Sequence, residues 1–225
     1  MRTKTLLLSA AVLAAGLSAS VAQSVFSVNA VGYVNVPLVV GFQIIANPLN
    51  NSNNLLSVIL PDVANNTTVY RFNPATQTFI NASTFFVDPG PPPVGVWFPD
   101  ATLNPGEGAF FSSPVAQTLT FVGEVPQGSL SNSLPQNYSL RSSIVPQTGG
   151  VSSVLGLTAQ NNDTVYFFNP ASQTYGAALT YFVDPGPPPS EVWFPNEPTP
   201  AVGQGFWFKN NSGTARSWTR TFSVN

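Results

Sequence analysis

A segment of 35 residues occurs twice in this chain, and this duplication limits how the chain can fold. Residues 65–99 and 161–195 are identical at 25 of 35 aligned positions, at a constant offset of 96. Propeller blades recur at roughly 50 residues, whereas a period of 96 is an ordinary size for a small domain. We therefore expect two homologous domains, residues 23–127 and 128–225.

Each copy alternates short strand patterns with turn signals. Residues 68–72 and 77–80 are rich in β-branched and aromatic side chains, which favours strands. The Asn-Pro-Ala-Thr between them is typical of a type I turn, and residues 165–175 repeat the hairpin. Strand patterns spaced by about 8–12 residues, without a convincing amphipathic helix, predict an all-β fold of two tandem β-sandwich or barrel-like domains.

Three other stretches have local patterns that limit their structure. Residues 55–60 fit both a short helical turn and a strand. The Asp-Pro-Gly-Pro-Pro-Pro stretches at 88–93 and 184–189 are expected to space two strands rigidly, with binding to an aromatic groove of a partner as the alternative. A Gly-x-Gly at 106–108 and 203–205 lacks the Gly-Lys-Ser/Thr of a phosphate loop, so it indicates a bulge or a close approach of backbones.

Residues 1–22 have the pattern of a cleaved secretory signal peptide of bacterial type. Arg2 and Lys4 precede an apolar run over residues 6–17, and small residues follow it. The run is shorter than the roughly 20 residues that a membrane-spanning helix needs, and an N-terminal core helix is the alternative. We expect an exported protein, secreted or held at the cell surface, whose mature chain does not span a membrane.

The mature chain would begin with an apolar strand. Residues 24–36, from Ser24 to Val36, are uncharged and rich in β-branched and aromatic side chains, a composition that favours a strand. One alternative is that this strand pairs inside its own domain. The other is that it pairs with a neighbouring molecule, because apolar strand edges are templates for strand addition. Self-association of the protein would follow from the second alternative.

The chain contains no cysteine and no histidine. These absences exclude disulfides, cysteine-bearing metal sites, the Ser-His-Asp triad and the usual zinc ligands. Only 7% of the residues are charged, against roughly 25% in typical globular chains. After the leader, five basic and nine acidic residues leave a net charge of −4. With so few basic residues, we expect no binding of nucleic acid.

The acidic residues do not form a convincing catalytic or metal-binding pattern. Asp88 and Asp184 recur in both copies, but each precedes Pro-Gly, where Asp is a common turn residue. Asp100, Glu107 and Glu124 have no acidic counterpart in the second copy. Calcium binding through Asp and backbone carbonyls stays open, although no EF-hand-type string occurs. We expect a protein that is not an enzyme, with no catalytic residues, no metal ligands and no cofactor.

Aromatic residues are the better candidates for binding. Trp97 and Trp193 occupy matching positions in the two copies. Their rings, and those of Phe85, Tyr181, Trp207 and Trp218, are candidates for stacking on sugar faces or on partner surfaces. The alternative for both tryptophans is a place in the core of a sandwich. The residues that we single out for contact with a ligand or partner are Trp97, Trp193, Phe85, Tyr181, Asp88 and Asp184.

Four motifs follow one another in the first copy: a Gly-aromatic opening that ends in Pro at 41–48, a Val-Tyr-x-Phe-x-Pro hairpin at 69–74, a strand with Trp97, and a closing Pro-Gly-x-Gly-aromatic-aromatic at 105–111. This order resembles a module widespread in secreted bacterial proteins. The tandem form after a signal peptide is similar to uncharacterised paralogous families of verrucomicrobial type. The resemblance covers nearly the whole mature chain, although the second copy departs from it at 137–141 and at Val202. It implies the fold and export, and no activity.

These observations lead to one main hypothesis about function. We expect a secreted, non-enzymatic structural or adhesive protein of the cell envelope or extracellular matrix. The alternative is a carbohydrate-binding module that binds surface glycans with its repeated aromatic residues. A hydrolase that relies on carboxylates alone comes third. Glycoside hydrolysis needs only a pair of carboxylates at a suitable distance, but the acidic residues of this chain form no convincing catalytic pattern.

Overall fold

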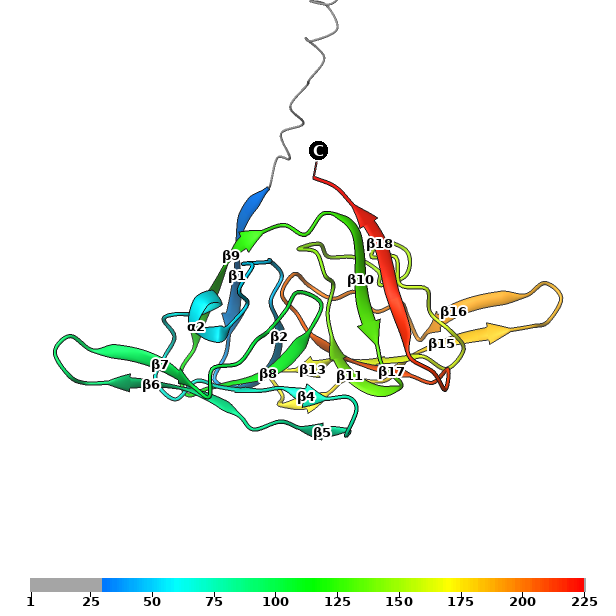
Figure 1. Ribbon diagram of the computed structural model, residues 1–225. Helices are drawn as coiled ribbons and strands as arrows, with labels where there is room; N and C mark the ends of the chain where they lie inside the picture. Colours follow the sequence, from blue (N-terminus) through cyan, green and yellow to red (C-terminus); the bar gives the residue numbers. More distant parts are fainter. Residues whose placement is uncertain (1–29, 225) are drawn as a thin grey trace, which may run out of the picture.

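The computed structural model describes residues 30–224, and within them antiparallel β-strands form nearly the whole fold (Figure 1). The expected all-β class is confirmed. The helix among these residues is α2 (Leu56–Ile59), a single turn, so the apolar stretch at 55–60 forms a helical turn. None of the described residues forms a helix long and apolar enough to span a bilayer.

In the first half of the chain, the described residues 30–127 form three small sheets. A five-stranded sheet has the order β2-β8-β3-β6-β7, β1 pairs with β9, and β4 pairs with β5. The strands are β1 (Val31–Leu38), β2 (Gly41–Ala46), β3 (Thr68–Tyr70), β4 (Phe72–Asn73), β5 (Thr78–Phe79), β6 (Ser83–Asp88), β7 (Val94–Phe98), β8 (Gly108–Ser113) and β9 (Gln117–Glu124).

The second half, from residue 128, repeats this topology strand for strand. Its five-stranded sheet has the order β11-β17-β12-β15-β16, β10 pairs with β18, and β13 pairs with β14. The strands are β10 (Gly128–Leu134), β11 (Asn137–Arg141), β12 (Thr164–Tyr166), β13 (Phe168–Asn169), β14 (Thr174–Tyr175), β15 (Leu179–Asp184), β16 (Ser190–Phe194), β17 (Phe206–Asn210) and β18 (Arg216–Phe222). The expected boundary after residue 127 falls between β9 and β10.

Each half buries an apolar core between its five-stranded sheet and one two-stranded sheet, which is β1–β9 in the first half and β10–β18 in the second. On β9 the buried Leu119 and Phe121 alternate with exposed residues, as the period of two in a strand requires. They belong to the same cluster as Phe111 of the five-stranded sheet. In the second half, Trp218 of β18 packs in one cluster with Phe208 of β17. Burial of each such side chain contributes about 1.5–3 kcal/mol.

The halves are joined by reciprocal backbone hydrogen bonds around an approximate two-fold axis, called the dyad below. The N–H of Ala46 donates to the carbonyl of Gly203 at 2.9 Å, and the matching N–H of Ser142 donates to the carbonyl of Gly106 at 3.0 Å. Figure 1 shows the halves side by side, with β1 and β9 in one matching β10 and β18 in the other. The first half therefore contacts the second through the same surface that the second presents to it.

The Gly-x-Gly motifs lie at this junction. A Cβ atom on Gly205 would lie 2.5 Å from the side chain of Ile44 and 3.3 Å from the Cα of Gly108. A larger residue would push the halves apart, so glycine is required here by the space available. The predicted close approach of two backbones is confirmed, and it is an approach between the halves.

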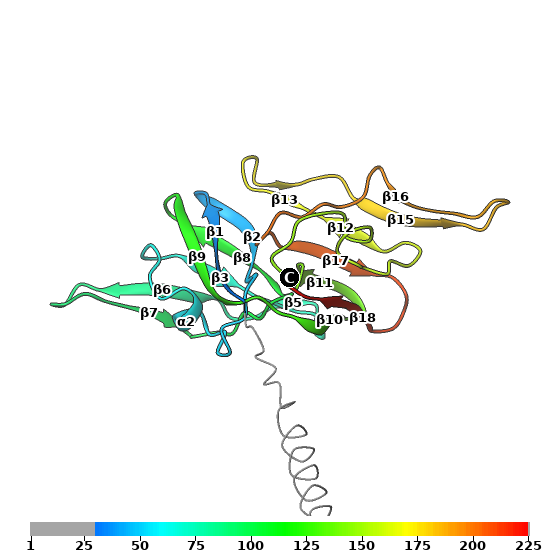
Figure 2. The same cartoon turned by 90° about the horizontal axis from the view of Figure 1, so that it is seen from above.

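Two hairpins project from opposite ends of the molecule as wings (Figures 1 and 2). One wing is β6–β7 and the other is β15–β16, and both are antiparallel pairs. The Pro-rich stretches at 88–93 and 184–189 form the turns at their tips, so each connects two paired strands, as expected.

The N-terminal strand pairs inside its own half. β1 is antiparallel to β9 over its whole length, from Val31 opposite Glu124 to Leu38 opposite Gln117. For residues 31–36, the alternative of pairing within their own unit is therefore the one observed. The rest of the predicted strand, residues 24–29, and the predicted signal peptide, residues 1–22, lie outside the described residues.

Candidate functional site

Each half extends a short hairpin over the other. Gln77, at the turn of β4–β5, has φ of 55°, and its side chain reaches Tyr138 on β11. Its Nε2 donates to the Tyr138 carbonyl at 3.0 Å, and its Oε1 accepts from the Tyr138 N–H at 3.1 Å. Gln173 of β13–β14 makes the same two bonds with Phe42 on β2, at 2.9 and 2.8 Å. The junction is thus held by two matching clamps.

Aromatic rings pack beneath these hairpins. Phe72 meets Trp207 edge to face with ring centroids 4.6 Å apart, and the dyad-related pair Phe168 and Phe110 meets at 5.4 Å. Both geometries are favourable for aromatic pairs, which contribute about 0.5–1.5 kcal/mol beyond burial. The buried residues at the centre of this cluster are Ile44, Phe110 and Leu140. The junction therefore has an apolar core of its own.

Two open cavities lie on this cluster, one on each side of the dyad. The first, about 440 Å³, is lined by Phe42, Tyr70, Phe79, Phe110, Phe168, Gln173 and Tyr175. The second, about 670 Å³, is lined by Phe72, Gln77, Phe79, Tyr138, Tyr166, Tyr175, Gly176 and Trp207. Phe79 and Tyr175 border both cavities and are each 50% exposed. We call the two adjoining cavities the aromatic groove.

The two ends of the aromatic groove differ in chemistry. The first cavity is lined mainly by phenylalanine, whereas the second has three tyrosines and a tryptophan. Trp207 Nε1 donates to the Tyr175 hydroxyl at 3.0 Å, and the Lys209 ammonium lies 5.5 Å from the centre of the Tyr138 ring. Burial, and then the neighbouring Tyr138 hydroxyl, raises the pKa of Tyr166. The second cavity therefore combines ring faces with hydroxyl groups.

Three of the residues predicted for ligand contact lie in the cores. Trp97 and Trp193 are each 5% exposed. Their indole N–H groups donate to the Leu60 carbonyl at 2.8 Å and to the Ser152 hydroxyl at 3.0 Å. Phe85 is buried against Trp97 with ring centroids 5.4 Å apart. No ring face of these residues is free for a ligand, so the core alternative is the one observed.

The other three predicted residues lie on the wings. The Tyr181 hydroxyl donates to Glu191 at 2.8 Å, and burial, with this bond, raises the pKa of Tyr181 to about 12. Asp88 and Asp184 are exposed and accept the N–H groups of Gly90 and Gly186 at 3.0 and 2.9 Å. Both carboxylates thus stabilise turns at the wing tips. None of the six lines the aromatic groove.

Apart from Trp207, the groove residues were missed in the sequence, although a signal existed. Five of the groove positions are aromatic in both copies, and the pairs are Phe42 with Tyr138, Tyr70 with Tyr166, Phe72 with Phe168, Phe79 with Tyr175, and Phe110 with Trp207. All ten residues border the groove. Trp97 and Trp193, on strands β7 and β16, are also aromatic in both copies, yet both side chains are buried in the cores. Repetition alone therefore does not distinguish a core ring from a groove ring.

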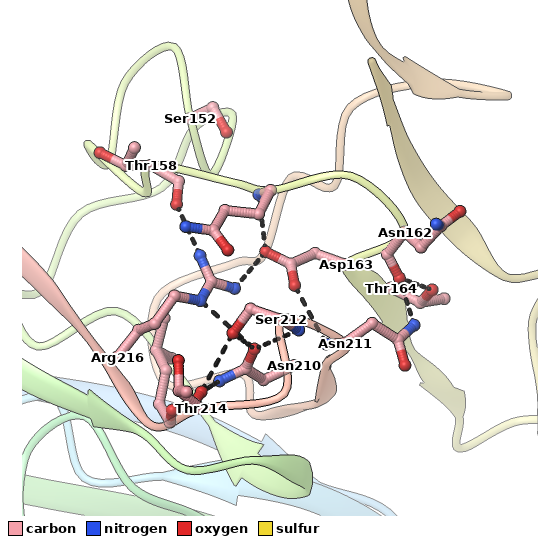
Figure 3. A network of polar contacts seen from close by, with 12 residues as sticks. Ser152, Thr158, Asn162, Asp163, Thr164, Asn210, Asn211, Ser212, Thr214 and Arg216 are labelled. Atoms are coloured by element: carbon pink, nitrogen blue, oxygen red, sulfur yellow. Dashed lines mark hydrogen bonds and ion pairs between the residues drawn. The ribbon is translucent and has the colours of Figure 1, made fainter. Parts of the chain in front are cut away.

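The second half contains a buried ion pair within a network of polar contacts (Figure 3). Asp163 is completely buried and pairs with Arg216, and it also accepts the Gln160 N–H at 2.8 Å. Arg216 donates further to the Thr158 carbonyl at 3.2 Å and to Asn210 at 3.3 Å. The carboxylate is enclosed by donors and has no access for a substrate.

The first half has a neutral version of this cluster. Gln117 takes the place of Arg216 and donates to the Thr67 hydroxyl at 2.9 Å and the Ser113 hydroxyl at 2.8 Å. Its Oε1 accepts the Ala64 N–H at 2.9 Å. Since the same connection between strands is made without charge, the pair in the second half has a structural role. Among residues 30–224, no group of three His, Cys, Asp or Glu side chains could hold a metal ion.

Comparisons of the chain with protein-family models, with curated proteins and with solved structures find no match. The function must therefore be argued from the aromatic groove, the wings and their chemistry.

Proposed function

We propose that this protein is an exported, non-catalytic adhesive protein of the cell envelope or extracellular matrix, and that it binds glycans in the aromatic groove. The observation that carries this proposal is the half-exposed pair Phe79 and Tyr175, which borders both cavities of the groove. Export is supported by the charged start, apolar run and small residues of the leader.

The second cavity has the chemistry that sugars require. Faces of sugar rings are apolar and stack on Tyr and Trp, while their hydroxyl groups need hydrogen-bonding partners. Tyr138, Tyr166 and Tyr175 supply hydroxyls next to ring faces, and Trp207 lies between them. The first cavity extends the same surface with phenylalanine rings. A chain of several sugar units therefore fits the groove better than a single sugar.

The groove is also held in shape before a ligand arrives. Phe79 and Tyr175 are at the ends of hairpins that Gln77 and Gln173 clamp to the opposite half. A rigid site loses less conformational entropy on binding, which favours affinity.

The test is glycan binding by the mature chain, first on a glycan array and then by calorimetry with the best oligosaccharide. Tyr175→Ala and Phe79→Ala should each weaken binding about 10-fold or more, since stacking of one ligand ring on an aromatic side chain contributes about 1–3 kcal/mol where it has been measured for nucleic-acid bases. Phe194→Ala is the matched control, because Phe194 is an exposed aromatic residue on a wing. Absence of glycan binding, or equal losses in the control, would overturn the proposal.

A second candidate function is assembly into a matrix through the wings. Phe98 is 73% exposed and Phe194 is 64% exposed, and valines at 94, 96 and 192 are exposed beside them. β7 and β16 are edge strands of their sheets, and apolar edges favour addition of another strand. We place self-association on the wings, because residues 31–36 are paired with β9.

Light scattering of the mature chain tests this second function. The wild-type chain should form large assemblies, and a variant with Phe98→Lys and Phe194→Lys should remain a monomer. A monomeric wild-type chain would contradict assembly and leave the glycan proposal unaffected.

A further inference from the structure

A third cavity, of about 230 Å³, lies where the two halves meet, beside the β4–β5 hairpin. Its wall combines residues of both halves, so it exists only in the assembled junction. The lining residues are Arg71, Phe72, Asn73, Pro74, Ile80, Leu103, Glu107, Gly108, Ser139, Leu140 and Arg141.

Arg141 is the first reason to regard this cavity as a binding site. Its side chain is 7% exposed, and its Nε donates to the Ser139 hydroxyl at 3.1 Å. The two terminal nitrogens of its guanidinium make no hydrogen bond to any residue that the structure describes, and no ion pair forms within 4.0 Å. Burial lowers the pKa of Arg141, while the nearby Glu107 carboxylate raises it. A buried cation with free donors on a cavity wall requires a polar partner.

Arg71 provides the second cation. Its Nε is buried and has no hydrogen-bond partner among residues 30–224. Its Nη1 reaches the Thr102 carbonyl only at 3.5 Å, the long limit of a hydrogen bond. Glu107 is partly engaged elsewhere, since its Oε2 accepts the Asn104 N–H at 2.9 Å. Both guanidinium groups therefore keep donors available in the same cavity.

The other side of the dyad shows that the fold does not need these charges. The positions that match Arg71, Arg141 and Glu107 are Phe167, Ile45 and Gln204. The backbone contact is nevertheless the same, because Ile45 and Gln204 form an isolated antiparallel bridge as Glu107 and Arg141 do. One side has therefore acquired two cations and an anion that the equivalent packing does without.

We propose that this cavity binds a singly charged carboxylate, such as the acid group of a uronic acid or a short organic acid. Two arginines and one glutamate leave one net positive charge, which a carboxylate neutralises. A guanidinium also presents parallel N–H donors that match the two oxygens of a carboxylate. This site is separate from the aromatic groove, and it does not depend on glycan binding there.

Titration of the isotope-labelled mature chain with sodium acetate, sodium glucuronate, sulfate and phosphate, followed by NMR at pH 7 and constant ionic strength, tests the proposal. Acetate and glucuronate should shift the amide signals of Ser139 and Leu140 in a saturable way. The matched variants are taken from the other half: Arg141→Ile, Arg71→Phe and Glu107→Gln. The two arginine variants should weaken carboxylate binding about 10- to 100-fold, the range of charge-assisted hydrogen bonds.

Glu107→Gln gives a result that misfolding could not imitate. It raises the net charge of the cavity to two, so it should strengthen anion binding and favour sulfate and phosphate over acetate. The proposal is overturned if no anion produces saturable shifts at this site, if Arg141→Ile binds acetate like the wild type, or if the wild type prefers sulfate and phosphate.

Thermal unfolding of each variant checks the fold. Arg141→Ile should be no less stable than the wild type, because apolar replacement of an unpaired buried charge is favourable.

Discussion

At the scale of single residues, the two copies reach the same local structure with different side chains. In the first half Asp100 accepts the N–H of Ser57 at 3.1 Å, at the start of helix α2. In the second half the neighbouring position, Glu197, accepts the N–H groups of Ser152 and Ser153 at 2.7 and 2.8 Å. The sequence indicated that Asp100 has no acidic counterpart, because Asn196 aligns with it. The longer side chain of Glu197 supplies the carboxylate from one position further on.

Glu197 makes stability depend on pH. Burial alone would raise the pKa of Glu197, but hydrogen bonds from Ser153 and Ser152 outweigh it and lower the pKa below its ordinary value of 4.5. The ionised form is thus favoured by folding, so its contribution is present above pH 4.5 and is lost as the pH falls through the folded-state pKa. Glu197→Gln should cost about 1–2 kcal/mol at pH 7, and the cost should shrink at lower pH.

Urea unfolding between pH 3 and 7 measures this difference. Asp62→Asn, which also removes a carboxylate but at an exposed position, is the control. A cost of Glu197→Gln that stays constant over the whole pH range would contradict the assigned role.

At the scale of elements, the hairpins β4–β5 and β13–β14 are short, but they connect the two halves. Each pairs over only two residues, and isolated hairpins are marginal at best. The glutamine at each turn compensates, because it also bonds its own turn, at the carbonyls of Pro74 and Pro170, 2.7 Å away in both. The hairpins are therefore stabilised mainly by the opposite half.

We predict that Gln77→Ala and Gln173→Ala each lower the free energy of unfolding by about 1–3 kcal/mol, because each removes two hydrogen bonds across the junction and one within the turn. Gln136→Ala, at an exposed position, is the matched control. Chemical denaturation of the three variants gives the comparison. Wild-type stability in both clamp variants would show that the hairpins are held by other contacts.

At the scale of the whole molecule, the halves share a core, a backbone junction and two clamps. The buried Leu140 belongs to the cluster between the halves, whereas Leu157 belongs to the core of the second half. Because the junction links both cores, we predict one cooperative thermal transition for the mature chain, with equal calorimetric and van't Hoff enthalpies.

Two variants extend this prediction in the same calorimeter. Leu140→Ala and Leu157→Ala should each cost about 2–5 kcal/mol and should shift the single transition to lower temperature. If the calorimetric curve of Leu157→Ala instead showed two transitions, with the first half unfolding at the higher temperature, the halves would unfold independently.

The sequence by itself determined the all-β class, the topological repeat and the hairpins, because these follow from local patterns of turns, β-branched residues and alternation. It also indicated the close approach at Gly108 and Gly205, since paired glycines mark backbone contacts. It did not reveal which aromatic residues face a groove. Trp97 and Tyr175 each have an aromatic counterpart in the other copy, yet Trp97 is buried in the core and Tyr175 is half-exposed.

Only the tertiary structure decided where the candidate sites lie. The aromatic groove and the arginine cavity both form at the junction of the halves, from residues more than 60 positions apart, such as Arg71 and Arg141. Repeats of one sequence encode the strands of each half, but the docking of one half on the other depends on the packing of many side chains at once. That packing gathers charged residues on one side of the dyad and uncharged residues on the other, a difference that no single copy contains.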